Sequence, residues 1–138
     1  MNYTMVKTES GYRIFQDRIP LLDGMQLRFL YDVQHHQVFD TNSLFAYFGS
    51  LEPFEQLTAL GLITLRPHRV PSRGEKVLIQ WKGTLFYAIQ ASVFRPEVTE
   101  KGICLLRDVK RSDTFSACME DMDQKIAERL LGQRIEHD

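Results

Sequence analysis

The feature that most constrains the fold is a pair of alternating stretches around a two-residue turn signal. Between residues 74 and 94, apolar residues recur at every second position on both sides of Lys82-Gly83, which indicates two strands. Glycine tolerates the positive φ that a two-residue hairpin turn requires. We therefore predict a hairpin whose return strand runs from Thr84 to Phe94 and ends at Arg95-Pro96, because proline cannot donate to the ladder. Both faces are fairly apolar, so the hairpin has to be covered on two sides.

The C-terminal segment has the periodicity of an amphipathic helix. Between residues 113 and 131, apolar residues recur every three or four positions, at Phe115, Met119, Met122, Ile126 and Leu130. Ser112 or Asp113 can cap the start of this helix, and Gly132 stands where a helix commonly ends. The apolar stripe needs a sheet or barrel to cover.

Two further segments alternate as strands do. Residues 25 to 33 place their apolar members on one face, and residues 102 to 109 suit a last strand. Residues 41 to 60 fit either a short helix or a strand. Strands first and one closing helix predict a mainly β fold. A length of 138 residues suits one domain, 1–138, with flexible termini at 1–11 and 133–138.

Composition narrows the function classes. The net charge of −1 and the pI of about 6.4 provide no overall basic field, so a nucleic-acid partner is disfavoured unless a local patch supplies one. The chain has no apolar stretch long enough for a membrane span and no signal-peptide core. Its two cysteines lack metal-ligand spacing, which indicates a cytoplasmic protein. No catalytic, cofactor or metal motif is found, so we expect no enzyme.

Residues 57 to 83 allow one interpretation as part of a DNA-binding domain. A helix over Glu52 to Leu60 would be a recognition helix, and Ile63 to Trp81 a wing with Arg66, His68, Arg69 and Arg73 at its tip. The sequence ahead of this helix is strand-like, and the helix carries two glutamates that phosphate would repel. Two more strands and a helix follow, which the motif does not require. A winged-helix transcriptional regulator is therefore the alternative hypothesis.

The same residues also suit a small β-barrel. Gln56 to Gly61 lead into an apolar strand, residues 70 to 77 combine a proline crossover with a Gly-led strand entry, and residues 102 to 106 form a Gly-led strand before the final helix. Upstream, residues 13 to 20 hold two arginines. This order resembles the PilZ domain family, bacterial receptors for cyclic di-GMP. The resemblance implies a PilZ-like antiparallel β-barrel closed by the C-terminal amphipathic helix.

The resemblance also implies a ligand site and a role. Its residues would be Arg13, Arg18, Gln56, Thr58 and Gly61, with Arg66, Arg69 and Arg73 as an alternative anion-binding patch. Arginine can bond phosphate bidentately and read guanine. The family has Asp or Asn and Ser where this chain has Gln56 and Thr58. We therefore expect a bacterial signalling or adaptor module that binds cyclic di-GMP weakly or not at all and acts through a protein partner.

Overall fold

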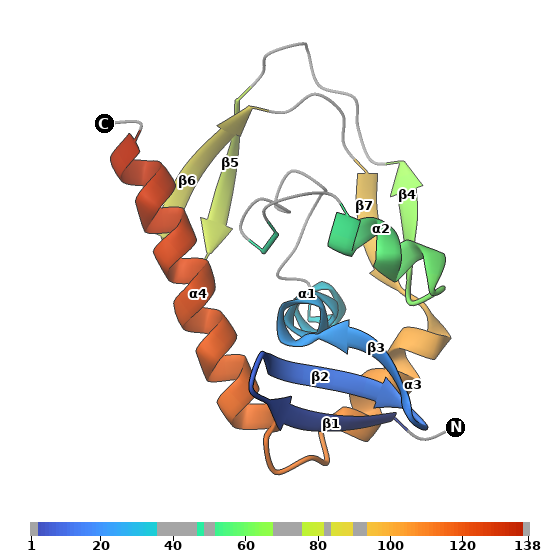
Figure 1. The fold of residues 1–138 in the computed structure, drawn as a ribbon. Helices are drawn as coiled ribbons and strands as arrows, with labels where there is room; N and C mark the ends of the chain where they lie inside the picture. The colour runs from blue at the N-terminus through green and yellow to red at the C-terminus, as the bar shows by residue number, and fades with distance from the viewer. Residues whose placement is uncertain are drawn as a thin grey trace.

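Helices and strands are mixed along the whole chain (Figure 1). The structure, a computed structural model, describes residues 3–35, 47–48, 52–67, 76–81, 84–89 and 94–136. The elements are β1 (Tyr3–Thr8), β2 (Gly11–Gln16), β3 (Ile19–Asp23), α1 (Gly24–Gln34), α2 (Glu52–Ala59), β4 (Ile63–Pro67), β5 (Lys76–Trp81), β6 (Thr84–Ile89), β7 (Phe94–Val98), α3 (Glu100–Val109) and α4 (Phe115–Glu136).

The prediction of a mainly β barrel is wrong. Among the described residues the strands form a three-stranded antiparallel sheet, β1-β2-β3, and two separate pairs, β4-β7 and β5-β6. None of these sheets closes on itself. The four described helices hold more residues than the seven strands. The fold is therefore mixed α/β, with helices packed against the three-stranded sheet and against the β4-β7 pair.

The error begins at residues 25–33, which form helix α1 and not a strand. Asp23 and Gln26 make a capping box: the Asp23 side chain accepts from the Gln26 amide at 2.8 Å, and the Gln26 side chain accepts from the Asp23 amide at 2.9 Å. Asp23-Gly24, a dipeptide typical of turns, is thus the start of a helix. The buried apolar residues on the helix, Leu27, Leu30 and Val33 among them, follow helical spacing as well as the alternation did.

Residues 102–109 are also helical. Thr99 is the N-cap of α3, and Leu105, Leu106 and Val109 are buried at helical spacing. The predicted strand end at Arg95-Pro96 is wrong as well, because both residues lie inside β7. Since β7 pairs only with β4 among the described strands, it has a free edge, where proline is tolerated.

The hairpin and the final helix are confirmed. β5 pairs with β6 from Lys76↔Ile89 to Trp81↔Thr84, although the described return strand ends at Ile89. α4 buries Cys118, Met122 and Ile126, and it continues past Gly132 to Glu136. Residues 3–8, expected to be part of a flexible terminus, form β1.

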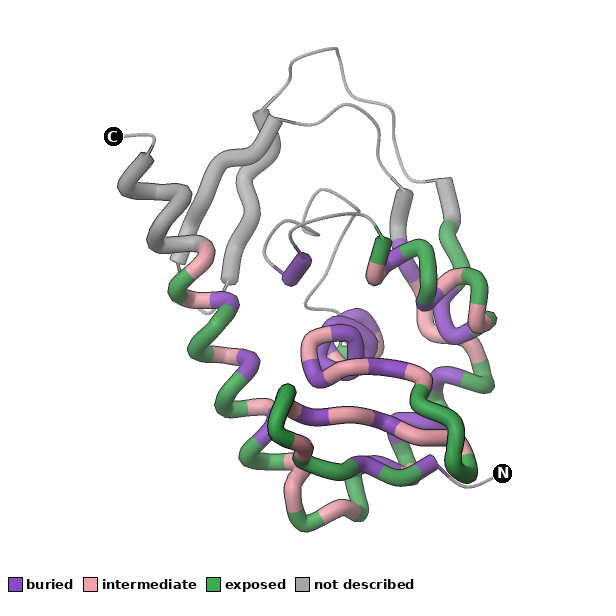
Figure 2. The backbone as a smooth tube through the Cα atoms, viewed as in Figure 1, coloured by how far each residue is buried: buried purple, intermediate pink, exposed green. Residues whose placement is uncertain are grey.

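The core surrounds α1, which contacts the β1-β2-β3 sheet on one side and α2, α3 and α4 on others (Figure 1). Figure 2 shows the buried residues gathered on α1 and on the faces turned toward it. Phe29 lies at the centre, fully buried, with the Tyr47 ring at 5.0 Å and the Phe54 ring at 5.8 Å, both edge-on. These aromatic contacts tie residues 47–48 and α2 to α1.

Candidate functional site

Helix α2 presents a polar face to solvent. Phe54 and Leu57 are buried, whereas Glu52, Glu55, Gln56 and Ala59 are exposed. The buried Gln26 of α1 holds the helix from below, because its Nε2 donates to the Pro53 carbonyl and to Gln56 Oε1, both at 3.0 Å. These bonds fix α2 to α1 and leave its polar face exposed to solvent.

The end of α2 is a Schellman turn that leads directly into β4. Gly61 has φ 75°, a left-handed conformation that side chains disfavour. The Leu62 amide donates to the Leu57 carbonyl at 3.1 Å, and the Gly61 amide donates to the Thr58 carbonyl at 3.0 Å. Leu57 and Leu62 are both fully buried, which gives the turn its usual apolar contact.

The start of α3 locks this turn in place. The Thr99 amide donates to the Leu62 carbonyl at 3.0 Å, and the Thr99 hydroxyl donates to the Gly61 carbonyl at 2.6 Å. Lys101 Nζ donates to the Leu60 carbonyl at 2.9 Å. Because Thr99 directly follows β7, these bonds join the α2–β4 corner to the β7–α3 corner. We call this set of contacts the corner clamp.

Strand β4 pairs with β7 across a long and basic insertion. The antiparallel ladder runs from Ile63↔Val98 to Pro67↔Phe94, so residues 68 to 93 leave and re-enter at one end of it. Residues 63 to 98 contain six Lys and Arg residues against two Glu, a net charge of +4. The whole chain has a net charge of −1, so positive charge is concentrated in this part of the sequence.

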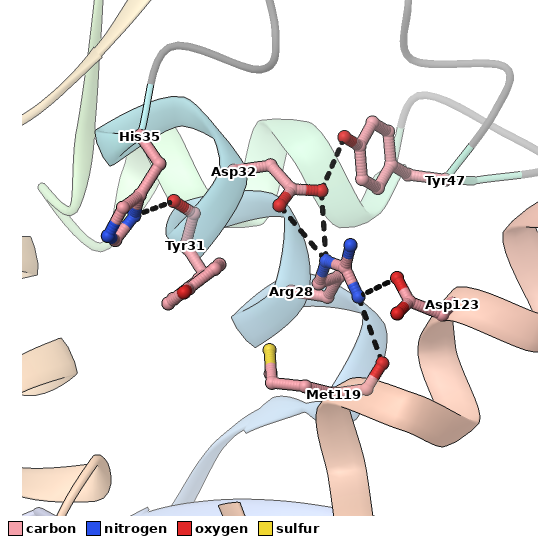
Figure 3. A network of polar contacts seen from close by, with 7 residues as sticks. All are labelled: Arg28, Tyr31, Asp32, His35, Tyr47, Met119 and Asp123. Atoms are coloured by element: carbon pink, nitrogen blue, oxygen red, sulfur yellow. Dashed lines mark hydrogen bonds and ion pairs between the residues drawn. The ribbon is translucent and has the colours of Figure 1, made fainter. Parts of the chain in front are cut away.

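A buried polar network joins α1 to Tyr47 and to α4 (Figure 3). Arg28 Nε donates to both carboxylate oxygens of Asp32, at 3.0 and 2.9 Å, and Tyr47 donates its hydroxyl to Asp32 at 2.7 Å. Arg28 Nη1 reaches α4, where it donates to the Met119 carbonyl at 2.9 Å and pairs with Asp123. One guanidinium therefore joins α1, the segment at residue 47, and α4.

Burial changes the proton affinities in this network. Burial raises the pKa of Asp32, and it outweighs the opposing effects of Arg28 and the Tyr47 hydroxyl. Burial, reinforced by the neighbouring Asp32, raises the pKa of Tyr47. Burial lowers the pKa of Arg28, but Asp32 and Asp123 raise it more. Arg28 and Tyr47 therefore remain proton donors at all ordinary pH values.

The five residues of the expected cyclic di-GMP site do not form a barrel pocket. The Arg13 guanidinium bonds within its own hairpin, to the Tyr12 carbonyl and Ser10 Oγ, and Arg18 is exposed in the β2–β3 turn. Gln56, Thr58 and Gly61 lie on α2 and its Schellman turn. There the Thr58 hydroxyl donates to the Glu55 carbonyl at 2.7 Å. The role expected of these residues depended on a closed barrel, which the described strands do not form.

The alternative patch is only partly described. Arg66 belongs to β4, opposite Arg95 in the ladder, whereas Arg69 and Arg73 lie outside the described residues. His35 is the C-cap residue of α1, and its ring stacks on Tyr31 with centroids 4.1 Å apart. Searching the described residues reveals no group of three or more His, Cys, Asp or Glu side chains placed to hold a metal ion.

Sequence reasoning missed the polar network. Arg28 and Asp32 have the i, i+4 spacing of a helical ion pair, but that signal has meaning only if residues 25–33 are a helix. Tyr47 and Asp123 are distant in sequence, and nothing in their local pattern marks them.

Comparison with models of known protein families, with curated proteins and with solved structures found no match to this chain. Within the described part of the chain, no helix has the length and apolarity that crossing a bilayer would require. A function must therefore be inferred from the geometry above.

Proposed function

We propose that this protein binds duplex DNA through a winged-helix-type unit. In this assignment α2 is the helix presented to the major groove, β4 and β7 are the strands of the wing, and the paired strands β5 and β6 lie between them in the sequence. Such a unit needs a supporting helix before the recognition helix and a hairpin directly after it. α1 fills the first place, and the β4-β7 pair fills the second.

The observation that carries this proposal is the corner clamp. A recognition helix is useful only if its angle to the wing is fixed, and Thr99 and Lys101 fix the last turn of α2 against the strand that closes the wing. The objections raised by the sequence are also reduced. The segment ahead of α2 is helical at α1, and the additional strands β5 and β6 pair with each other inside the wing, so they do not compete with its base.

The proposed roles of α2 and of residues 63 to 98 differ because their charges differ. The exposed Glu52 and Glu55 would be repelled by phosphate, so α2 would not supply electrostatic affinity. The basic residues of 63 to 98 would contact the backbone, and the exposed face of α2 would meet base edges. We assign this DNA-binding module to the cytoplasm. The free Cys104 and Cys118 suit its reducing conditions.

The test is binding of a random-sequence duplex, measured by fluorescence anisotropy over a range of salt concentrations. We expect binding at low salt that weakens steeply, because each neutralised phosphate contributes about −0.9 to the slope of log K against log salt. The Arg69→Glu/Arg73→Glu variant should lose about two units of slope. The matched control, Arg107→Glu/Arg111→Glu, makes the same charge change at exposed positions on and just after α3. The proposal fails if the wild-type protein does not bind at low salt, or if both variants lose binding equally.

A further inference from the structure

Besides its buried apolar residues, helix α4 carries two aspartates, two residues apart, that contact the rest of the fold. Asp121 accepts the Tyr12 hydroxyl from β2 at 3.0 Å, and Asp123 pairs with Arg28 of α1. The first contact ends at the sheet. The second contact continues into the core, because Arg28 also donates to Asp32, and Asp32 accepts the Tyr47 hydroxyl.

Tyr47 lies five positions before the start of α2. Its side chain is almost fully buried, its hydroxyl is fixed by Asp32, and its ring packs edge-on against Phe29. The Phe29 ring also packs edge-on against the Phe54 ring of α2. The orientation of the Asp32 carboxylate therefore affects the position of Tyr47 and, through Phe29, the packing of α2. Arg28 fixes that orientation with a bifurcated hydrogen bond from its Nε.

We infer that Arg28 is a positioning residue through which the docking of α4 controls the placement of α2, and thereby the affinity for DNA. This inference rests on the proposed function for its effect on DNA. The Arg28 side chain is only 6% exposed, and its Nη1 is directed at α4 (Figure 3). When α4 leaves, Nη1 loses the Met119 carbonyl and Asp123 together. Because Nη1 and Nε belong to one rigid, planar guanidinium, a change at Nη1 also changes the bond from Nε to Asp32, and through it the contact of Asp32 with Tyr47.

The experiment compares Asp123→Ala with Asp121→Ala. Both remove one carboxylate from α4 and one of its contacts to the body, but only Asp123 touches Arg28. Amide hydrogen exchange is measured in every element, at a temperature where all variants are folded, and duplex affinity is measured in parallel. Asp123→Ala should speed exchange of the α2 amides roughly tenfold, the equivalent of losing one charged hydrogen bond. It should weaken duplex binding by a similar factor without altering the salt slope. Asp121→Ala should change neither the exchange of the α2 amides nor the duplex affinity.

Tyr47→Phe provides the second arm. It removes the hydroxyl at the far end of the network and leaves α4 docked, so its effect on α2 exchange should not multiply with that of Asp123→Ala in the double variant. Exchange that rises uniformly in all elements would show a structural role only and would overturn the inference. So would an equal response to Asp121→Ala, or independent effects in the double variant. If exchange responds as expected but the wild-type protein does not bind DNA, the coupling stands and the proposed function fails.

Discussion

Gly102→Ala tests how closely α3 approaches the α2–β4 corner. A Cβ at residue 102 would lie 2.5 Å from Val98 Cγ1 and 2.6 Å from the Leu62 carbonyl oxygen. The valine methyl can move, but the carbonyl belongs to the backbone and accepts the Thr99 amide. The start of α3 must therefore back away from the turn, and the corner clamp must lengthen.

The expected loss of stability follows from three effects. Overpacking costs about 1–3 kcal/mol, the weakened Thr99–Leu62 hydrogen bond costs about 1 kcal/mol, and alanine returns up to about 1 kcal/mol as the better helix former. The net loss is about 1–3 kcal/mol. At roughly 4 °C per kcal/mol for a chain of this size, Tm should fall by about 4–12 °C in a calorimetric scan.

Two variants serve as controls for this prediction. Glu100→Ala changes an exposed residue in the same turn, so it should shift Tm little. Val98→Ala combined with Gly102→Ala removes the methyl clash and leaves the carbonyl clash, so it should not restore wild-type stability. A Gly102→Ala protein as stable as wild type would mean that helix propensity outweighs crowding and that the corner is not closely packed.

Three other changes have defined outcomes. Gly61→Ala should cost about 1–2 kcal/mol in urea unfolding, because φ 75° places a Cβ in the left-handed region; an unchanged midpoint would contradict the Schellman turn. Burial raises the pKa of Cys118 to about 11 from the 9.0 of a free thiol, so the unfolded chain ionises first and stability falls between pH 9 and pH 11. Up to about 3 kcal/mol of this loss should be missing from the matching curve for Cys118→Ala. Ile126→Asp places a carboxylate at a fully buried position and should lower stability by several kcal/mol; a wild-type Tm would show that α4 does not pack as described.

Local patterns correctly predicted the elements whose apolar spacing fits only one type of secondary structure. The Lys82-Gly83 hairpin and the Phe115 to Ile126 stripe are of this kind. Residues 25–33 satisfy both strand and helix spacing, because Leu27, Phe29 and Leu30 are all buried around one helix in the centre of the fold. There the usual polar face is absent, since even Arg28 and Asp32 are inside and neutralise each other. Only the Asp23–Gln26 capping box separates the two outcomes, and Asp23-Gly24 is equally a common turn signal.

The candidate site was less predictable for a related reason. The corner clamp consists of backbone carbonyls of residues 60 to 62 bonded by residues about 38 positions later. Carbonyl acceptors leave no trace in the sequence, because every residue carries one. Thr99 and Lys101 could be identified only once the β4-β7 pair had brought them to Leu60 and Gly61.

The pairing of β4 with β7 also has a consequence for the order in which the chain folds. Residues 3 to 34 form β1, β2, β3 and α1 with contacts between neighbours in sequence, and such local structure forms quickly. The β4-β7 ladder instead has to close a loop of residues 68 to 93 before its first contact forms, and closing a loop costs entropy in advance. During synthesis, α2 therefore emerges well before the strand that fixes it. Until residues 94 to 102 have been made, the nascent chain holds β1, β2, β3 and α1, together with an α2 that lacks the bonds of the corner clamp.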